Sequence, residues 1–142
     1  MKPPDEVKRE LVVRWLDKAE EDFRVAGYLS SGETVFLSAI GFHAQQAVEK
    51  YLKALLVHHQ VEFPKTHDIQ ELLNLLAPVA PSLAGSLRDA AELTPYGVEV
   101  RYPDDFPDMT QDEAVAAVDT AAKVREAVLA ALKDVSWSPK GV

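Results

Sequence analysis

All four histidines of this chain lie in one short middle segment, together with three lysines. They are His43, His58, His59 and His67, with Lys50, Lys53 and Lys65. Imidazole exchanges protons near neutral pH, and ammonium groups attract phosphate. Three basic against two acidic side chains give residues 43–67 a net charge of +1, whereas residues 1–42 have −2 and residues 68–142 have −7. An anionic ligand is therefore expected to bind at residues 43–67.

Within this segment, His43, Gln46, Lys50 and Lys53 follow steps of three, four and three residues. On a helix they share one sector, which either faces a phosphate or is the solvated flank of a mostly buried helix. Lys65-Thr66-His67 precedes another predicted helix, where a cation and an imidazole beside free backbone N–H groups favour anions, although helix capping explains the same residues. His58 and His59 end a predicted helix, where imidazolium suits the helix dipole, and they are interpreted as surface residues.

Three polar residues, Asp22, His43 and Arg125, occupy helical positions next to or within apolar stripes. A buried charge costs free energy unless it is paired, so each of them requires a partner. Asp22 is ten residues before Gly32 and His43 is eleven residues after it. In an antiparallel helical hairpin these two positions are nearly level, which predicts an Asp22–His43 contact.

The Asp22–His43 pair has two interpretations. It either orients an imidazole beside an anion site or fixes the register of two helices. Arg125 has three: it reaches an acidic side chain within the bundle, lies at an interface between two subunits, or extends its charged end to the surface.

Hydrophobic periodicity predicts the helices that position these residues. A first helix covers about residues 6–30 and ends at Gly32, and a second runs from a cap at Thr34 to about His59. The second is apolar around much of its circumference, so it is expected to be the central helix of a bundle. The join between the two is short, which predicts an antiparallel hairpin.

Shorter elements follow in the second half of the chain. Asp68 with Glu71 predicts a capping box for a helix over about 68–77, and a further short helix is expected over 82–94, ending near Pro95. Residues 96–108 are interpreted as an ordered loop. Thr110 with Glu113 predicts a second capping box, for a helix running to about Asp134. The chain is therefore predicted to be all-α, with a core over about 6–134 and a frayed tail over 135–142.

Composition limits the classes of protein that fit this arrangement. The chain has 142 residues, 47% of them hydrophobic and 27% charged, with a net charge of −8 and no cysteine. These values predict one globular domain over 1–142, without disulfides, thiolate metal sites or broad affinity for DNA or anionic membranes. The charged first residues lack an apolar region behind them, so no secretory signal is expected and the chain is interpreted as cytoplasmic. Neither metal-ligand spacing nor a glycine-rich phosphate loop is present, so no metal or cofactor is expected.

Four blocks of sequence resemble the HEPN family of small helical domains. They are Trp15-Leu16-Asp17-Lys18-Ala19-Glu20-Glu21-Asp22-Phe23, Phe42-His43-Ala44-Gln45-Gln46-Ala47-Val48-Glu49-Lys50-Tyr51-Leu52-Lys53-Ala54-Leu55, Pro64-Lys65-Thr66-His67-Asp68 and Arg101-Tyr102-Pro103. The resemblance covers about residues 12–134. It implies a four- to five-helix up-and-down bundle that dimerises and is similar to the helical C-terminal domain of antibiotic nucleotidyltransferases.

The same resemblance implies partners and an activity. Prokaryotic HEPN proteins are often encoded beside a minimal nucleotidyltransferase as a toxin–antitoxin-like pair. Many members are metal-independent ribonucleases whose motif is an arginine followed, after four to six residues, by a histidine. In that motif the histidine acts as general acid or base and the arginine offsets phosphate charge.

This chain departs from the ribonuclease motif, because the eligible positions after Arg101 hold Phe106, Pro107 and Asp108. The leading hypothesis is a non-catalytic or weakly catalytic homodimeric subunit that pairs with a minimal nucleotidyltransferase and binds nucleotide or RNA phosphate. The expected binding residues are His43, Lys50, Lys65, His67, Arg101 and Tyr102. One alternative is a ribonuclease toxin with a rearranged pair of Arg101 and either His43 or His67, and another is a non-catalytic helical scaffold.

Overall fold

The computed structural model describes residues 2–32, 36–97 and 109–140 of the chain. Within them the only regular elements are helices: α1 (Pro4–Ser31), α2 (Leu37–His58), α3 (Ile69–Leu76), α4 (Pro81–Ser86), the 3-10 helix η1 (Arg88–Gly97) and α5 (Gln111–Ala131). The all-α prediction is confirmed. Each helix of this described part is too short or too polar to cross a membrane.

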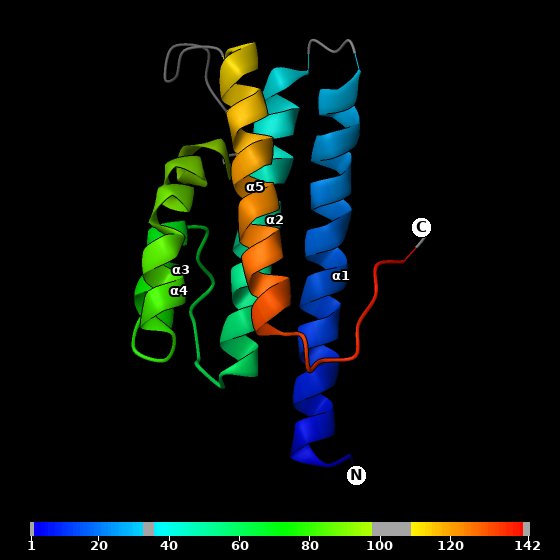
Figure 1. Ribbon diagram of the computed structural model, residues 1–142, viewed down its shortest axis with the longest axis vertical. Coiled ribbons are helices and arrows are strands. Elements are labelled where there is room, and N and C mark those ends of the chain that lie inside the picture. Colours follow the sequence, from blue (N-terminus) through cyan, green and yellow to red (C-terminus); the bar gives the residue numbers. More distant parts are fainter. Residues whose placement is uncertain (1, 33–35, 98–108, 141–142) are drawn as a thin grey trace.

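The central position belongs to α2, as the sequence predicted. It contacts α1, α3, α5 and η1, and α1 and α2 run antiparallel as neighbours. Figure 1 shows α1 at one edge of the bundle, α2 and α5 in the middle, and α3 and α4 at the opposite edge. Thirteen residues of α2 are buried, among them Tyr51, Leu52 and Leu55 with no exposed surface. The candidate residues on α2, among them His43 and Lys50, therefore lie on a helix whose backbone is fixed on several sides.

Local sequence explains where α1 and α5 begin. Pro4 stands at the first position of α1, where a missing N–H costs nothing, and Asp5 and Glu6 suit the positive end of the helix dipole. The predicted capping box starts α5: the Thr110 hydroxyl accepts from the Glu113 N–H at 3.1 Å, and the Glu113 carboxylate accepts from the Thr110 N–H at 2.9 Å. That helix ends at Ala131, three residues before the predicted end at Asp134.

Two short elements differ from the prediction. Asp68 caps α3 as expected, but Glu71 does not complete a capping box, because its carboxylate accepts from the Thr66 hydroxyl at 2.8 Å. The Asp68 N–H donates to that hydroxyl instead. The helix predicted over 82–94 is α4 followed by η1, which continues through Pro95 to Gly97. A 3-10 turn accommodates the fixed φ of proline and loses only one backbone hydrogen bond there.

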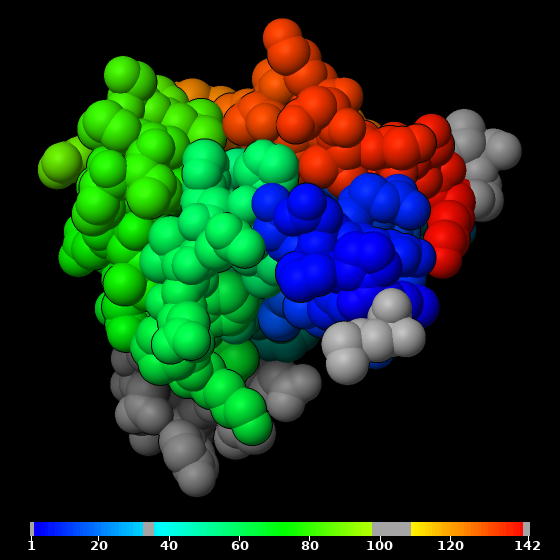
Figure 2. Space-filling model, turned by 90° about the horizontal axis from the view of Figure 1, so that it is seen from below, coloured from blue at the N-terminus to red at the C-terminus, as the bar shows by residue number. Residues whose placement is uncertain are grey.

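The prediction of a frayed tail is wrong for residues 136–140. This segment lies along α1, where the Trp137 indole N–H donates to Asp17 at 2.9 Å and the Lys140 ammonium lies 3.1 Å from the same carboxylate. Arg9 and Arg24 donate to carbonyl oxygens of the tail. Figure 2 shows the tail in red beside the blue α1. The indole ring, which packs against the core, gives the tail the apolar contact that its short polar sequence did not suggest.

Some expectations concern residues outside the described parts of the chain. The cap at Thr34 is one of them. Most of the loop expected at 96–108 is another, and it includes Arg101 and Tyr102.

Candidate functional site

His43 and Asp22 form the contact that was predicted by counting from Gly32. His43 Nδ1 lies 2.8 Å from Asp22 Oδ1, and Lys50 Nζ lies 2.5 Å from Oδ2 of the same carboxylate. Asp22 is buried, with 9% of its surface exposed, whereas the side chain of His43 is 30% exposed. The burial predicted for this pair therefore holds for the aspartate, and the imidazole lies at the edge of the helix pair.

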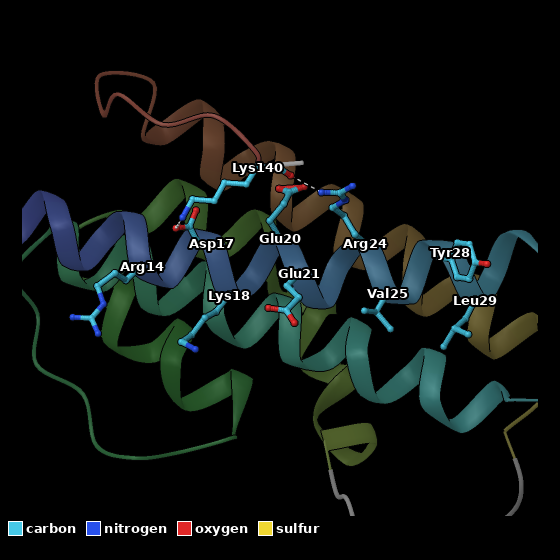
Figure 3. A pocket seen from close by; sticks show the side chains of 10 residues that line it. All are labelled: Arg14, Asp17, Lys18, Glu20, Glu21, Arg24, Val25, Tyr28, Leu29 and Lys140. Atoms are coloured by element: carbon cyan, nitrogen blue, oxygen red, sulfur yellow. Dashed lines mark hydrogen bonds and ion pairs between the residues drawn. The ribbon is translucent and has the colours of Figure 1, made fainter. Parts of the chain in front are cut away.

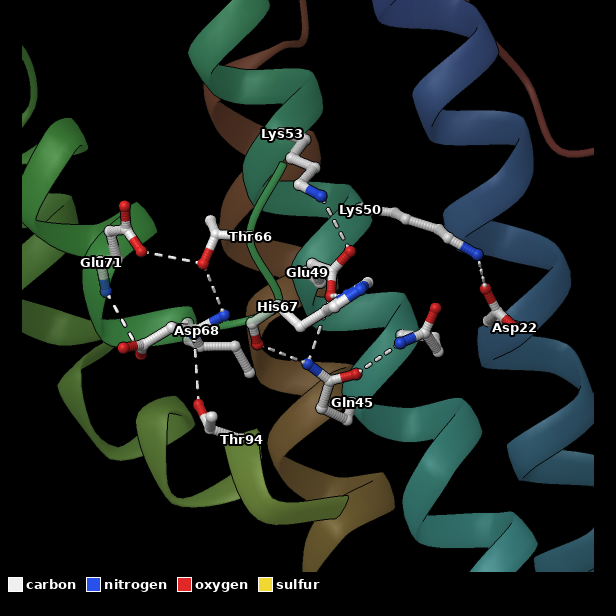
Figure 4. Close-up of polar contacts among 12 residues, drawn as sticks. Asp22, Gln45, Glu49, Lys50, Lys53, Thr66, His67, Asp68, Glu71 and Thr94 are labelled. Atoms are coloured by element: carbon white, nitrogen blue, oxygen red, sulfur yellow. Dashed lines mark hydrogen bonds and ion pairs between the residues drawn. The ribbon is translucent and has the colours of Figure 1, made fainter. Parts of the chain in front are cut away.

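The second cluster joins α2 to the segment before α3 through the carboxylate of Glu49 (Figure 4). Glu49 Oε1 lies 2.7 Å from His67 Nδ1, and Oε2 lies 2.9 Å from Lys53 Nζ. The amide of Gln45 donates to the carbonyl oxygen of His67 at 3.0 Å. The loop that carries His67 is therefore held to α2 both through its backbone and through its imidazole.

Exposure within this second cluster is uneven. The side chains of Glu49 and Lys53 are 3% and 7% exposed, whereas that of His67 is 73% exposed. An ionised carboxylate can only accept a hydrogen bond, so Nδ1 of His67 must donate to Glu49. Nε2 is then the second ring nitrogen, and no hydrogen bond joins it to any residue of the described chain; it donates in the imidazolium form and accepts in the neutral form. A buried carboxylate thus fixes the orientation of an exposed imidazole.

The predicted strip on α2 is only partly exposed, and both of its lysines are paired. Lys50 is held by Asp22, and Lys53 is buried beside the rings of Trp15 and Phe63, with Nζ at 5.4 and 5.8 Å from their centroids. Figure 4 shows Lys50 reaching to α1 while Lys53 turns toward Glu49. The reason is that each lysine neutralises a carboxylate that would otherwise be buried unpaired. Lys65, by contrast, is exposed.

Arg125 pairs with an acidic side chain inside the bundle, which was one of its three interpretations. Its Nε lies 3.0 and 3.1 Å from the two carboxylate oxygens of Glu20, and the Tyr51 hydroxyl donates to Glu20 Oε2 at 3.3 Å. Burial and the charge of Glu20 raise the pKa of Tyr51 far above its ordinary value. Burial opposes the charge of Arg125, but its hydrogen bond to Glu20 and the Glu20 charge outweigh burial and raise its pKa. This third cluster is structural, because it ties α1, α2 and α5 together.

The two histidines at the end of α2 are not the surface imidazolium groups that the sequence suggested. His58 and His59 are both partly buried, and their rings make an edge-to-face contact at 5.4 Å. Burial, followed by the nearby His58 and Lys8, lowers the pKa of His59. The neutral imidazole is therefore favoured at His59, and a role as a cation at the helix end is not.

The two histidine clusters lie on different flanks of α2, one toward α1 and one toward the segment before α3. Arg101 and Tyr102 lie outside the described residues, and the last described residue before them is Gly97. Gly97 lies directly against Gln45, since a Cβ there would come within 2.6 Å of the Gln45 side chain. The described chain therefore reaches the Glu49–His67 cluster immediately before the segment that contains Arg101.

Sequence reasoning missed Gln45, Glu49 and Glu20, although a signal for them was present. All three are polar, and all three are buried. Asp22 was singled out because it is a polar residue within an apolar stripe. The same rule applies to Glu20, which follows Leu16 by one helical turn. It applies also to Glu49, which follows Val48 on the mostly apolar α2. In the described residues, no group of three or more histidine and acidic side chains is arranged to hold a metal ion.

These features define a class of protein: an all-helical domain in which two histidines are paired with buried carboxylates on different flanks of the central helix. A family model for the HEPN domain matches residues 12–133. The chain belongs to the HEPN family, and the resemblance noted in its sequence is confirmed. A search of curated proteins gave no significant match, and a search of solved structures gave none either.

Proposed function

We propose that this HEPN domain is the helical subunit of a toxin–antitoxin-like pair with a minimal nucleotidyltransferase. In this proposal it forms a homodimer, and it binds the phosphate of a nucleotide or RNA at the surface of α2. The observation that carries the binding proposal is the exposed imidazole of His67, held at 2.7 Å by the buried Glu49. Family membership supports a nucleotide-related role.

Charge balance supports the same location. Asp22 is paired with Lys50, and Glu49 is paired with Lys53, so the two buried carboxylates are neutralised within the protein. The groups that remain to meet an anion are the imidazoles of His43 and His67 and the exposed ammonium of Lys65. An anion that approaches this surface therefore meets the Lys65 ammonium and, when the imidazoles are protonated, their Nε2–H donors, rather than uncompensated carboxylates. Arg101 and Tyr102, which follow Gly97 in the sequence, are proposed to contribute to the same phosphate site.

Binding is tested by isothermal calorimetry with ATP and by filter binding with a short single-stranded RNA. We expect His67→Ala to weaken binding about tenfold, the loss typical of one charge-assisted hydrogen bond. His58→Ala is the matched control, because His58 is also a partly exposed imidazole but lies at the far end of α2. Equal affinities for the two variants would overturn the proposed site.

The partner is tested by co-expression with any minimal nucleotidyltransferase that is encoded next to this chain, followed by affinity purification and size-exclusion chromatography. A stable complex supports the pairing. Separate elution of the two proteins at micromolar concentration contradicts it, whatever the result for nucleotide binding.

A second candidate function, metal-independent RNA cleavage, is favoured by one observation. Glu49 leaves Nε2 of His67 as a proton acceptor, which is what a general base for a ribose 2′-hydroxyl requires. Growth arrest on expression that is relieved by both His67→Ala and Arg101→Ala would support this function. RNA that stays intact after incubation with micromolar protein would exclude it.

A further inference from the structure

The outer face of α1 is exposed along its whole length. Val7, Leu11, Arg14, Lys18, Glu21 and Tyr28 are all exposed, and their spacing is four, three, four, three and seven residues. At about 100° per residue these positions fall within one sector of the helix, opposite the row of Val12, Leu16, Ala19 and Ala26 that packs into the core. This spacing is the 3.5-residue repeat with which two helices pack against each other.

The ends of this face are apolar and its middle is charged. Val7 and Leu11 are each 42% exposed near the start of α1, and Tyr28 is 80% exposed near its end, beside the partly buried Val25. Arg14, Lys18 and Glu21 lie between the two apolar ends. None of these three charged side chains has an ion-pair partner among the residues that the structure describes.

The surface here is also hollowed. A groove of about 870 Å³ follows α1 from Arg14 to Leu29 and is bordered by Lys140 of the tail (Figure 3). A smaller hollow of about 250 Å³, lined by Leu11, Arg14, Trp15 and Lys18, continues it toward the start of the helix. Large exposed apolar side chains that flank a groove are typical of a surface that another protein covers.

The order of the charged residues along α1 determines which partner fits this face and in which direction the partner helix runs. In an antiparallel pair of α1 helices, with a two-fold axis beside Lys18, Leu11 of one copy is opposite Val25 of the other, and Val7 is opposite Tyr28. Arg14 is then opposite Glu21, and the same Glu21 is one turn from Lys18 of the other copy. A parallel pair would instead place like charges opposite each other. The face is thus complementary to itself only when the second copy is reversed.

We propose that the outer face of α1 is the homodimer interface, and that two copies of this chain pack their α1 helices antiparallel about a two-fold axis beside Lys18. This inference rests on the homodimer of the proposed function and specifies its surface. The 28-residue helix α1 is about 42 Å long, so one helix pair covers less than the ~800 Å² per partner of a standard interface. We therefore expect a dimer that dissociates at micromolar concentration.

Charge reversal tests the pairing by sedimentation velocity over a series of concentrations. Arg14→Glu and Glu21→Arg should each weaken the dimer, by about tenfold in Kd, because each places like charges opposite each other. The double variant R14E/E21R restores both pairs between positions 14 and 21 and should recover most of the lost affinity, although the new guanidinium at position 21 then lies one turn from Lys18 of the other copy. Glu126→Arg, an exposed position on α5, is the control for a change in net charge.

Engineered cysteines test the direction, since the chain has none of its own. Lys18→Cys should form a disulfide-linked dimer under mild oxidation, and a mixture of the R14C and E21C variants should form a mixed dimer. R14C alone should not, because its two copies would be about 11 Å apart along the axis, too far for a disulfide. A parallel interface would instead cross-link R14C with itself and not with E21C, whereas the Lys18→Cys dimer would form in either direction.

The outcomes separate the inference from the proposed function. A dimer that is unaffected by either reversal, or that the double variant does not restore, overturns the α1 interface but leaves the homodimer standing. A monomer at every concentration overturns both. Reversals that leave a dimer unchanged but abolish binding of the nucleotidyltransferase would show that this face belongs to that partner instead.

Discussion

Three buried carboxylates determine how the polar residues of this bundle are arranged. Glu20, Asp22 and Glu49 are 6%, 9% and 2% exposed, and each contacts at least one cationic side chain. No buried side-chain nitrogen or oxygen in the described residues lacks a hydrogen-bond partner. Two of the carboxylates also hold a histidine, and the third holds a tyrosine. The two histidine clusters therefore differ from the Glu20 cluster in that each holds an imidazole that is at least partly exposed.

Glu20→Ala is expected to destabilise the fold by about 3 kcal/mol. The substitution leaves the partly buried Arg125 and the buried Tyr51 hydroxyl without their acceptor, and an unpaired buried charge is costly. Arg125 is 25% exposed, which places the expected cost at the low end of the range for buried pairs. Urea denaturation followed by circular dichroism measures the loss. Glu126→Ala, next to Arg125 and exposed, should change stability by less than about 0.5 kcal/mol.

The helices themselves were predictable because their signals are local. The apolar repeat located α1, α2 and α5, and the caps at Asp68 and Thr110 were visible as residue types at fixed spacing. Residues 81–97 were not, because the choice between one α-helix and a short helix followed by a 3-10 helix depends on packing against α2, α3 and α5. Local propensity does not contain that information.

The capping box of α5 should make stability depend on pH in the acid range. The hydrogen bonds from the backbone and side chain of Thr110 lower the pKa of Glu113 below its ordinary value. The contribution is therefore present above the pKa that Glu113 has in the unfolded chain, and is lost as the pH falls through its folded pKa. The difference in unfolding free energy between the wild type and Glu113→Gln should shrink from pH 6 to pH 3.

Thr110→Ala provides the comparison at neutral pH. Loss of the side chain that accepts from the first turn should cost about 1 kcal/mol. A difference between wild type and Glu113→Gln that stays constant down to pH 3 would contradict the role of the Glu113 carboxylate at this cap.

At the scale of the whole molecule, the candidate site was predictable only in part. Asp22 and His43 could be paired from sequence because few residues separate their antiparallel helices, so counting from Gly32 fixes their relative height. Glu49 and His67 could not, because the direction of the segment between α2 and α3 is set by contacts that sequence does not show. One of these is the hydrogen bond from Gln45 to the backbone of His67.

The tail is a second feature of whole-molecule packing. Trp137→Ala should destabilise the protein by about 1–3 kcal/mol, because it removes both a half-buried ring and the hydrogen bond to Asp17. Trp137→Phe keeps most of the ring contact, so its cost should be about 1 kcal/mol. Urea denaturation at neutral pH distinguishes the two. Equal stability of the wild type and Trp137→Ala would mean that the tail does not contribute to the fold.

The positions of the two indole rings make the protein suitable for label-free spectroscopy. Trp15 lies beside Lys53, which contacts the Glu49 that holds His67, whereas Trp137 lies on the tail against Asp17. In the Trp137→Phe protein, tryptophan fluorescence, excited selectively over that of the tyrosines, comes from Trp15 alone. Its emission then reports rearrangement of the ion pair beneath His67, so occupation of the candidate site can be followed without modifying the ligand.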